Sequence, residues 1–309
     1  MIDPERYGIS FSVKQCRNFG VDPHAALDWL IAQGWRRFRL MSYWDEHEKQ
    51  PGVYDFAALD WQIRRISEAG GVITLALGVK QPRWPEYHWP RWAWEAEPAL
   101  RDKALLMYVQ KTVEHYRNSP SIISYQLENE ALLSNFGEKI AINRARLRQE
   151  MQLVRRIDAS RAVVMSTSNG WGVPVRSPRA DIVGFSCYFR LYSHGRYHTT
   201  IQSPWLHRLR KGVIRAITHK PVFIHELQCE PWGPTAIWKM SVAEQDKSMS
   251  TEFISSNIAA ARSIGAYPID LWGSEWWYWR HVHGDPSIWK AVEASLALPM
   301  DEQGWLPVQ

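Results

Sequence analysis

Short apolar runs alternate with longer amphipathic stretches from one end of the chain to the other. Each short run has five to seven residues and ends at polar, glycine or proline residues. This pattern is typical of strands that are buried on both faces of a sheet. We therefore predict eight strands, at Tyr7–Val13, Arg36–Met41, Val72–Leu77, Ile122–Leu127, Ala162–Thr167, Asp181–Ser186, Val222–Glu226 and Tyr267–Trp272.

The stretches between these runs have helical periodicity. In residues 98–118, for example, Leu105, Tyr108 and Val109 recur at the spacing of one helix face. The connection at 170–180 is too rich in glycine and proline to predict a helix. Helices are predicted at 24–33, 55–69, 98–118, 137–157, 202–218, 242–264 and 286–296.

Eight strand–helix units in 309 residues match a closed (β/α)₈ barrel, the TIM barrel, within the α/β class. No glycine-rich phosphate-binding motif follows the first strand, which disfavours a dinucleotide-binding open sheet. No linker or low-complexity tract interrupts the pattern. We expect one barrel domain over residues 1–309, with long tryptophan-rich loops after some strands.

Composition limits the possible partners. Hydrophobic residues make up 45% of the chain and charged residues 22%, as in ordinary globular proteins, and no apolar run is long enough to predict a membrane span. The net charge is +5, but the basic residues are dispersed in pairs, so no nucleic-acid partner is expected. Three cysteines predict neither a disulfide framework nor a zinc site. The polar N-terminal residues do not resemble a signal peptide, so a cytoplasmic location is expected. Oligomeric state is not predicted.

Tryptophan is unusually frequent, with 18 residues. Trp84 and three more tryptophans lie close together after the third strand, and Trp276 begins a second aromatic run after the eighth. Flat aromatic side chains suit the C–H faces of sugars, although core packing accounts for some of them. We expect Trp84 and Trp276 to contact a ligand.

Acidic residues follow three of the predicted strands at their carboxyl ends, where barrels collect their functional groups. Glu128 and Glu130 end the fourth strand, Glu226 ends the seventh, and Glu275 follows the eighth. Strand alternation would place Glu128 on the same face as Glu130, so both are expected to point inward. Glu128 is expected to bind a ligand hydroxyl or to pair with Arg39, and it is the alternative to Glu130 as catalytic acid.

Cleavage of a glycosidic bond uses two carboxyl groups that lie on opposite sides of the bond. One donates a proton to the leaving oxygen, and the other attacks the sugar or activates water. A carboxylate cluster can also hold a metal ion, as in sugar isomerase barrels. The strand ends offer mainly glutamate, with His225 as the one nearby imidazole. We therefore favour acid–base chemistry without a metal or other cofactor.

These residues form a pattern that resembles clan A of the glycoside hydrolases, the retaining (β/α)₈ enzymes that include cellulases, mannanases and β-galactosidases. The similarity rests on Asn129-Glu130 after the fourth strand, within the string 126–130 (QLENE), and on Glu226 after the seventh. The segment 44–56 also resembles a clan passage. Further matches, in chain order, are Arg39, Tyr188 and Trp272.

The resemblance implies a role for each matched residue. Glu226 would be the nucleophile and Glu130 the acid and then the base, with their carboxyl groups roughly 5–5.5 Å apart. Asn129 would bind the sugar 2-hydroxyl, and Trp272 would floor the sugar site. The residues expected to contact an oligosaccharide, polysaccharide or simple glycoside are Arg39, Asn129, Tyr188, Trp272, Glu128, Glu275, Trp84 and Trp276.

The chain departs from the clan at two positions, and other functions stay open. Where many members have histidine near the third strand end, this chain has Lys80-Gln81, and Ser186 replaces a histidine two residues before Tyr188. Glu130 could instead cap a helix, and Glu226 could be structural. A non-catalytic carbohydrate-binding barrel and a metal-dependent sugar isomerase are the alternative functions.

Overall fold

The computed structural model describes residues 2–133, 143–170 and 179–298. Eight parallel strands close into a barrel in the order β1-β10-β9-β6-β5-β4-β3-β2, which confirms the predicted fold class. Closure is visible in the register, because β1 pairs with β10 through Tyr7 and Ile269 and with β2 through Ile9 and Phe38. The strands are β1 (Tyr7–Phe11), β2 (Arg37–Met41), β3 (Val72–Leu77), β4 (Ile122–Leu127), β5 (Ala162–Thr167), β6 (Ile182–Cys187), β9 (Val222–Gln228) and β10 (Ile269–Trp272).

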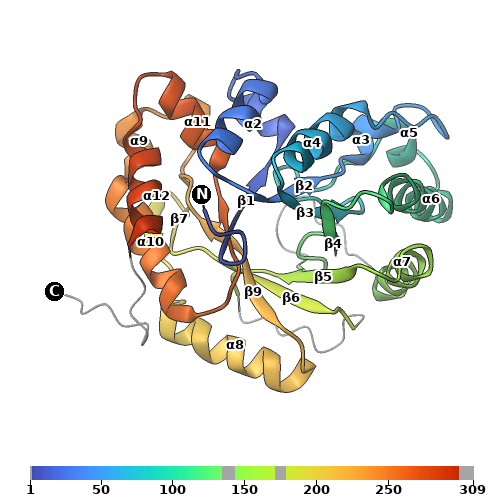
Figure 1. Ribbon diagram of the computed structural model, residues 1–309. Coiled ribbons are helices and arrows are strands. Elements are labelled where there is room, and N and C mark those ends of the chain that lie inside the picture. Colours follow the sequence, from blue (N-terminus) through green and yellow to red (C-terminus); the bar gives the residue numbers. More distant parts are fainter. Residues whose placement is uncertain (1, 134–142, 171–178, 299–309) are drawn as a thin grey trace.

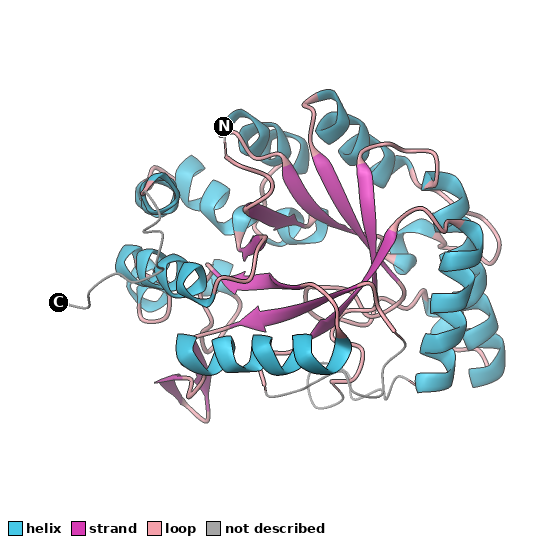
Figure 2. Cartoon of the chain, turned by 60° about the horizontal axis from the view of Figure 1, so that its bottom comes forward, coloured by secondary structure: helices cyan, strands magenta, loops and turns pink. Residues whose placement is uncertain are grey.

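Helices surround this barrel (Figures 1 and 2). All seven predicted helical stretches contain a helix, although the predicted residues 137–142 and most of the 170–180 connection lie outside the described residues. The helices are α1 (Val13–Asn18), α2 (Pro23–Ala32), α3 (Trp44–His47), α4 (Ala57–Glu68), α5 (Arg91–Trp94), α6 (Pro98–Tyr116), α7 (Arg144–Ile157), α8 (Pro204–Thr218), α9 (Val242–Asp246), α10 (Thr251–Ile264), α11 (Ser274–Val282) and α12 (Ser287–Ala297), with a 3₁₀ turn η1 at Ile237–Lys239.

Local sequence signals explain where several helices begin. Asp22 caps α2 by accepting hydrogen bonds from the backbone of His24 and Ala25, and Pro23 occupies the first turn, where its missing N–H costs nothing. Ser203 caps α8 in the same way. Such caps satisfy donors that have no partner inside the helix, so the boundaries between strand and helix are encoded locally.

Besides the short helices α1, α3 and α5 and the turn η1, two further features were not predicted. The first is a hairpin of β7 (Arg190–Ser193) and β8 (Arg196–Thr199) that follows β6. The second is α11, which contains the aromatic run after β10 that was expected to be a ligand-binding loop. Residues 78–90 form a long loop after β3 at the carboxyl-terminal mouth of the barrel, and this loop bears on the site. Within the described residues, no helix combines the length and hydrophobicity needed to cross a lipid bilayer.

Candidate active site

Glu226 lies on β9 and is held by two partners. Its Oε1 accepts a hydrogen bond of 2.7 Å from Arg39, and its Oε2 accepts one of 3.0 Å from the Tyr188 hydroxyl. Arg39 on β2 is fixed in turn, because it donates to Ser10 at 2.8 Å. Burial alone would raise the pKa of Glu226, but the Arg39 guanidinium and the hydrogen bonds outweigh it and lower the pKa. Glu226 is therefore a buried, oriented carboxylate.

Glu130 follows β4 and lies in a different environment. Its backbone φ is +44°, and its N–H donates to the Ser166 hydroxyl at 2.8 Å. Ser186 donates to Glu130 Oε1 at 2.7 Å, so the serine at this departure from the clan pattern contacts a predicted catalytic group. Burial and then the negative charge of Glu226 raise the pKa of Glu130 to about 7. Near neutral pH a large share of Glu130 is thus protonated.

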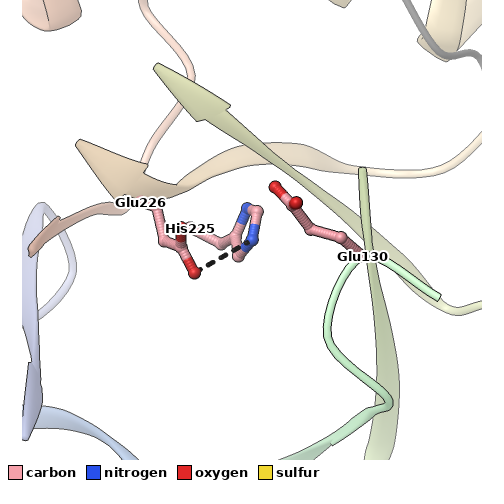
Figure 3. A group of neighbouring side chains, drawn as sticks. All are labelled: Glu130, His225 and Glu226. Atoms are coloured by element: carbon pink, nitrogen blue, oxygen red, sulfur yellow. Dashed lines mark ion pairs between the residues drawn. The ribbon is translucent and has the colours of Figure 1, made fainter. Parts of the chain in front are cut away.

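The two glutamates lie near each other on opposite sides of His225 in the view of Figure 3. One oxygen of Glu130, one oxygen of Glu226 and one ring nitrogen of His225 all lie within 4.8 Å of one another. This distance joins single oxygen atoms of the two acids, and it shows that both acids meet at the mouth of the barrel. The expected convergence of Glu130 and Glu226 is confirmed as geometry.

The same three side chains are the donor set that a metal ion would need, since catalytic zinc sites use three protein ligands. Their surroundings fit a metal poorly. The Arg39 guanidinium already neutralises Glu226 at 2.7 Å and would repel a second cation at that carboxylate. Burial lowers the pKa of His225 to about 4, and its Nε2 is 3.7 Å from Glu226 Oε1. The imidazole is therefore neutral, a form that does not itself exclude a metal, so the poor fit rests on the Arg39 guanidinium.

Asn129 lines the same cavity beside the pair. Its Oδ1 accepts a hydrogen bond of 3.1 Å from Gln126, and its backbone N–H donates to the Lys80 carbonyl at 2.6 Å. With its oxygen engaged in this way, Asn129 can present its amide NH₂ group to a ligand.

Trp272 closes one wall of the site together with a charged cluster that the sequence did not predict. Arg83 stacks on the Trp272 ring, with its guanidinium carbon 3.9 Å from the ring centroid. Its two terminal nitrogens donate to Glu230 Oε1 and Glu275 Oε2, both at 2.5 Å. Trp272 Nε1 also donates to Glu230 Oε1, at 2.7 Å. We call these four residues, Arg83, Glu230, Glu275 and Trp272, the Arg83 bridge.

A cavity of about 810 Å³ opens above the carboxylate pair, which is within the size range of small-molecule sites. Polar groups lie near the pair, while the outer wall is largely apolar and aromatic. Members of that outer wall include Trp84, Leu133, Leu191, Pro231, Trp232, Pro234, Ala236, Ile237 and Trp238.

Of the predicted contact residues, Asn129, Tyr188, Trp272 and Trp84 line the cavity together with the carboxylate pair, and Arg39 lies behind Glu226. Trp84 is 70% exposed, as a surface for stacking requires.

Besides Arg39, three predicted contact residues do not line the cavity. Glu128 is buried against the backbone N–H groups of residues 79 and 80 and pairs with Arg146 at 3.3 Å, so its expected pairing with Arg39 is wrong. The alternation argument failed because β4 ends at Leu127 and Glu128 has a φ of +51°. Glu275 is fully buried in the Arg83 bridge, where it also accepts from the Ser12 N–H at 2.5 Å.

Trp276 is the third of them, because it is fully buried in α11 and its Nε1 donates to Gln245 at 2.8 Å. The expected ligand contact of Trp276 is therefore wrong. A helix buries one face of an aromatic run, which a loop interpretation does not anticipate.

The cavity also contains charged residues that sequence reasoning missed, namely Arg83, Glu86 and Glu230. Burial raises the pKa of Glu86 to about 7, although Lys80 lies 3.4 Å from it. Two weak signals were present in the sequence. Arg83 directly precedes Trp84 in a proline-bounded loop, and Glu230 follows Glu226 by four residues at the same strand end.

No known protein-family model matches this chain. Its structure is similar to that of an exo-β-1,4-mannosidase from Opitutaceae bacterium strain TAV5, with 16% sequence identity, a TM-score of 0.63 and coverage of 87% of this chain. This chain spans 51% of the mannosidase chain.

A second similar structure is a glycosylated endo-β-1,4-xylanase of family GH10 from Gloeophyllum trabeum, with 14% identity, a TM-score of 0.64 and coverage of 96% of this chain and 98% of that one. A third is GH5_18 from Streptomyces cattleya in complex with GlcNAc, with 13% identity, a TM-score of 0.62 and coverage of 88% and 71%. At these identities the comparison establishes the architecture. The chain therefore has the barrel fold of the clan A glycoside hydrolases, the clan that its sequence motifs resemble.

Proposed function

We propose that the protein is a retaining glycoside hydrolase that cleaves β-glycosidic bonds by double displacement. The observation that carries this proposal is the close approach of Glu130 and Glu226 in opposite electrostatic environments. The pKa of Glu226 is lowered and that of Glu130 is raised to about 7. Two carboxyl groups with separated pKa values are the arrangement that assigns one as nucleophile and the other as acid.

In the first step the Glu226 carboxylate attacks the anomeric carbon while the bond from that carbon to the leaving oxygen breaks. Glu130 donates its proton to this oxygen, so the leaving group departs as a neutral alcohol. Arg39 and Tyr188 keep Glu226 ionised and aim it at the sugar. The product of the step is a glycosyl ester of Glu226.

In the second step the ionised Glu130 removes a proton from water, and the water oxygen attacks the anomeric carbon. The ester bond to Glu226 breaks, and its carboxylate is restored. The switch in the role of Glu130 follows from electrostatics, because esterification removes the negative charge that raises its pKa. Each step conserves protons between Glu130, the leaving group and water.

The remaining cavity residues suit a saccharide. Asn129 can donate its amide group to the 2-hydroxyl, a contact that strengthens in the transition state. Trp84 and Trp232 offer aromatic surface at the outer wall of the cavity, where a sugar ring or an apolar leaving group can stack. The proposed substrate is an oligosaccharide, a polysaccharide or a simple β-glycoside.

Trapping of the covalent intermediate tests the proposal directly. A panel of 2-deoxy-2-fluoro β-glycosides with activated leaving groups and gluco, galacto, manno and xylo configurations should yield one adduct. Peptide mass spectrometry should locate that adduct on Glu226, and Glu226→Gln should abolish it. An adduct on another residue would contradict the role of Glu226, and failure of the whole panel both to label and to be hydrolysed would contradict the function.

The two alternative functions are separated by simple controls. A non-catalytic binding barrel would hydrolyse no aryl glycoside, and its sugar affinity would survive Glu130→Ala. A metal-dependent isomerase would lose activity with EDTA and regain it with a divalent ion. Because Arg39 already neutralises Glu226, we expect aryl glycoside hydrolysis to be unchanged by EDTA.

A further inference from the structure

The loop after β3 crosses the mouth of the barrel. Near its base it lies over the ends of β2 and the following residues, where the Asp45 N–H donates to the His88 carbonyl at 3.1 Å and the Tyr43 hydroxyl donates to the Pro82 carbonyl at 3.3 Å. Its residue Arg83 then reaches Glu230 and Glu275, which follow β9 and β10. In the barrel order, β9 is four strands from β3 in either direction, so the loop spans the full width of the mouth.

The far end of this crossing is firmly held. Arg83 is 8% exposed and Glu275 is fully buried, and both ion pairs have distances of 2.5 Å. Each carboxylate has a further donor, Trp272 Nε1 for Glu230 and the Ser12 N–H for Glu275. A buried guanidinium between two carboxylates with additional hydrogen bonds resists separation, because breaking one pair leaves an uncompensated buried charge. The Arg83 bridge is therefore a fixed wall.

The position of the Arg83 bridge relative to Glu130 and Glu226 indicates which end of a bound sugar it meets. Glu130 follows β4, and β4 is four strands from β10 in either direction. In the proposed reaction Glu130 protonates the leaving oxygen, so the leaving group lies on the β4 side. The non-reducing end of the sugar then points toward β10, where the Arg83 bridge stands.

Glu230 offers a second way to distinguish a terminal sugar from an internal one, through hydrogen bonding. Its Oε2 is buried and has no hydrogen-bond partner among the described residues, and Glu230 lines the cavity. A carboxylate oxygen accepts hydrogen bonds but cannot donate them. A terminal sugar offers a free hydroxyl to such an oxygen, whereas an internal sugar presents a glycosidic oxygen without a proton at the position where the chain continues.

We propose that the Arg83 bridge closes the glycone side of the cavity, so that the enzyme removes single sugar residues from non-reducing ends and does not cleave internal bonds. This inference rests on the proposed retaining glycosidase function and adds exo action to it. In this arrangement a free terminal hydroxyl donates a hydrogen bond to Glu230 Oε2, whereas a further sugar residue would clash with the Arg83 bridge.

The action pattern of the unaltered protein is the primary test. The sugar configuration comes from the aryl β-glycoside panel, and the matching tetrasaccharide is labelled at its reducing end. We expect free monosaccharide and labelled trisaccharide as the first products. A second tetrasaccharide is methylated at the terminal hydroxyl through which the chain would continue, and we expect its kcat/KM to be lower by at least about a hundredfold. Early labelled monosaccharide or disaccharide, or equal cleavage of the capped substrate, would overturn the inference.

Variants test whether the bridge is the cause. Arg83→Ala should bring the kcat/KM for the capped tetrasaccharide within about tenfold of that for the uncapped one, because the wall is removed. Arg91→Ala is the matched control, since Arg91 lies just beyond the same loop with an exposed side chain paired to Glu95. This variant should keep the discrimination of the unaltered protein, defined as the ratio of kcat/KM for the uncapped tetrasaccharide to that for the capped one. Discrimination unchanged in folded Arg83→Ala would refute the assignment to Arg83. If that variant does not fold, Glu230→Gln, which keeps the shape of the side chain, should lower the discrimination at least about tenfold, and unchanged discrimination would refute the role of Glu230.

The outcomes separate the two proposals. Absence of turnover and of covalent trapping removes the glycosidase function and the exo inference together. Turnover of an aryl glycoside with internal cleavage of the tetrasaccharide removes only the exo inference.

Discussion

The pKa of Glu130 should fall when Glu226 loses its charge. The perturbation is Glu226→Gln, which keeps the shape of the side chain and its hydrogen bond from Arg39. The nearest oxygens of the two carboxyl groups lie within 4.8 Å. With the charge spread over the carboxylate, a unit charge about 5–6 Å away at an effective dielectric constant of about 20 contributes about 3 kcal/mol, or roughly two pKa units.

The pKa of Glu130 should therefore move from about 7 in the unaltered protein toward a value one to two units lower, by the same estimate of about 3 kcal/mol at most. Burial, the largest cause of the shift, still acts in the variant and keeps the pKa above that of a free glutamate. Carboxyl ¹³C NMR titration measures this value, with Glu130→Gln to assign the signal. Glu95→Gln, which alters an exposed glutamate, is the control and should leave the titration unchanged.

The same two groups set the pH dependence of activity. Hydrolysis needs Glu226 ionised and Glu130 protonated, so kcat/KM should rise with pH through the lowered pKa of Glu226 and fall with pH through about 7. If the pKa of Glu130 stays within about half a unit in Glu226→Gln, the charge of Glu226 does not set it. The proposed switch of Glu130 from acid to base would then have no electrostatic basis.

Three further substitutions test other parts of the structure. Glu130→Gln should lower the rate at least about a hundredfold for substrates with poor leaving groups and much less for activated aryl glycosides, and equal losses would contradict its role as acid. Tyr188→Phe removes a hydrogen bond to ionised Glu226, so the pKa of Glu226 should rise and the acid limb of the pH–rate profile should move to higher pH; an unmoved limb would refute this. Arg146→Met leaves two buried carboxylates without their partner and should reduce the free energy of unfolding in urea by about 3–5 kcal/mol, whereas Arg148→Met at an exposed position of the same helix should change it little.

The barrel could be predicted from sequence because its strands are encoded locally. Each strand is a short apolar run between turn residues, so all eight predicted runs coincide with strands of the barrel within a few residues. The carboxylate pair could be placed at the mouth for the same reason, since Glu130 and Glu226 stand at strand ends. Local pattern is sufficient where position in the strand determines position in space.

The other part of the site depends on the path of loops and on backbone geometry. Nothing near Arg83 in the sequence indicates that its side chain spans the mouth to Glu230, because that contact joins residues 147 positions apart. Glu128 was misplaced because strand alternation ends where the backbone takes a positive φ. The position of Glu128 also depends on Gly78, which has a φ of +98°, because a Cβ there would lie 2.4 Å from the Glu128 carboxyl carbon. Such tertiary contacts have no periodic signature in the sequence.

The Arg83 bridge also constrains how this protein can diverge. Its arginine lies in the loop after β3, Glu230 follows β9, and Glu275 lies in the first turn of α11. Loss of the arginine alone would leave two buried acids unpaired, and loss of one acid would leave the arginine with a single partner. Single exchanges are therefore costly, whereas joint replacement by well-packed apolar side chains is tolerable. Among homologous chains, positions 83, 230 and 275 should covary. Homologues that lack the arginine and both glutamates at these positions should be those whose substrate preference has changed.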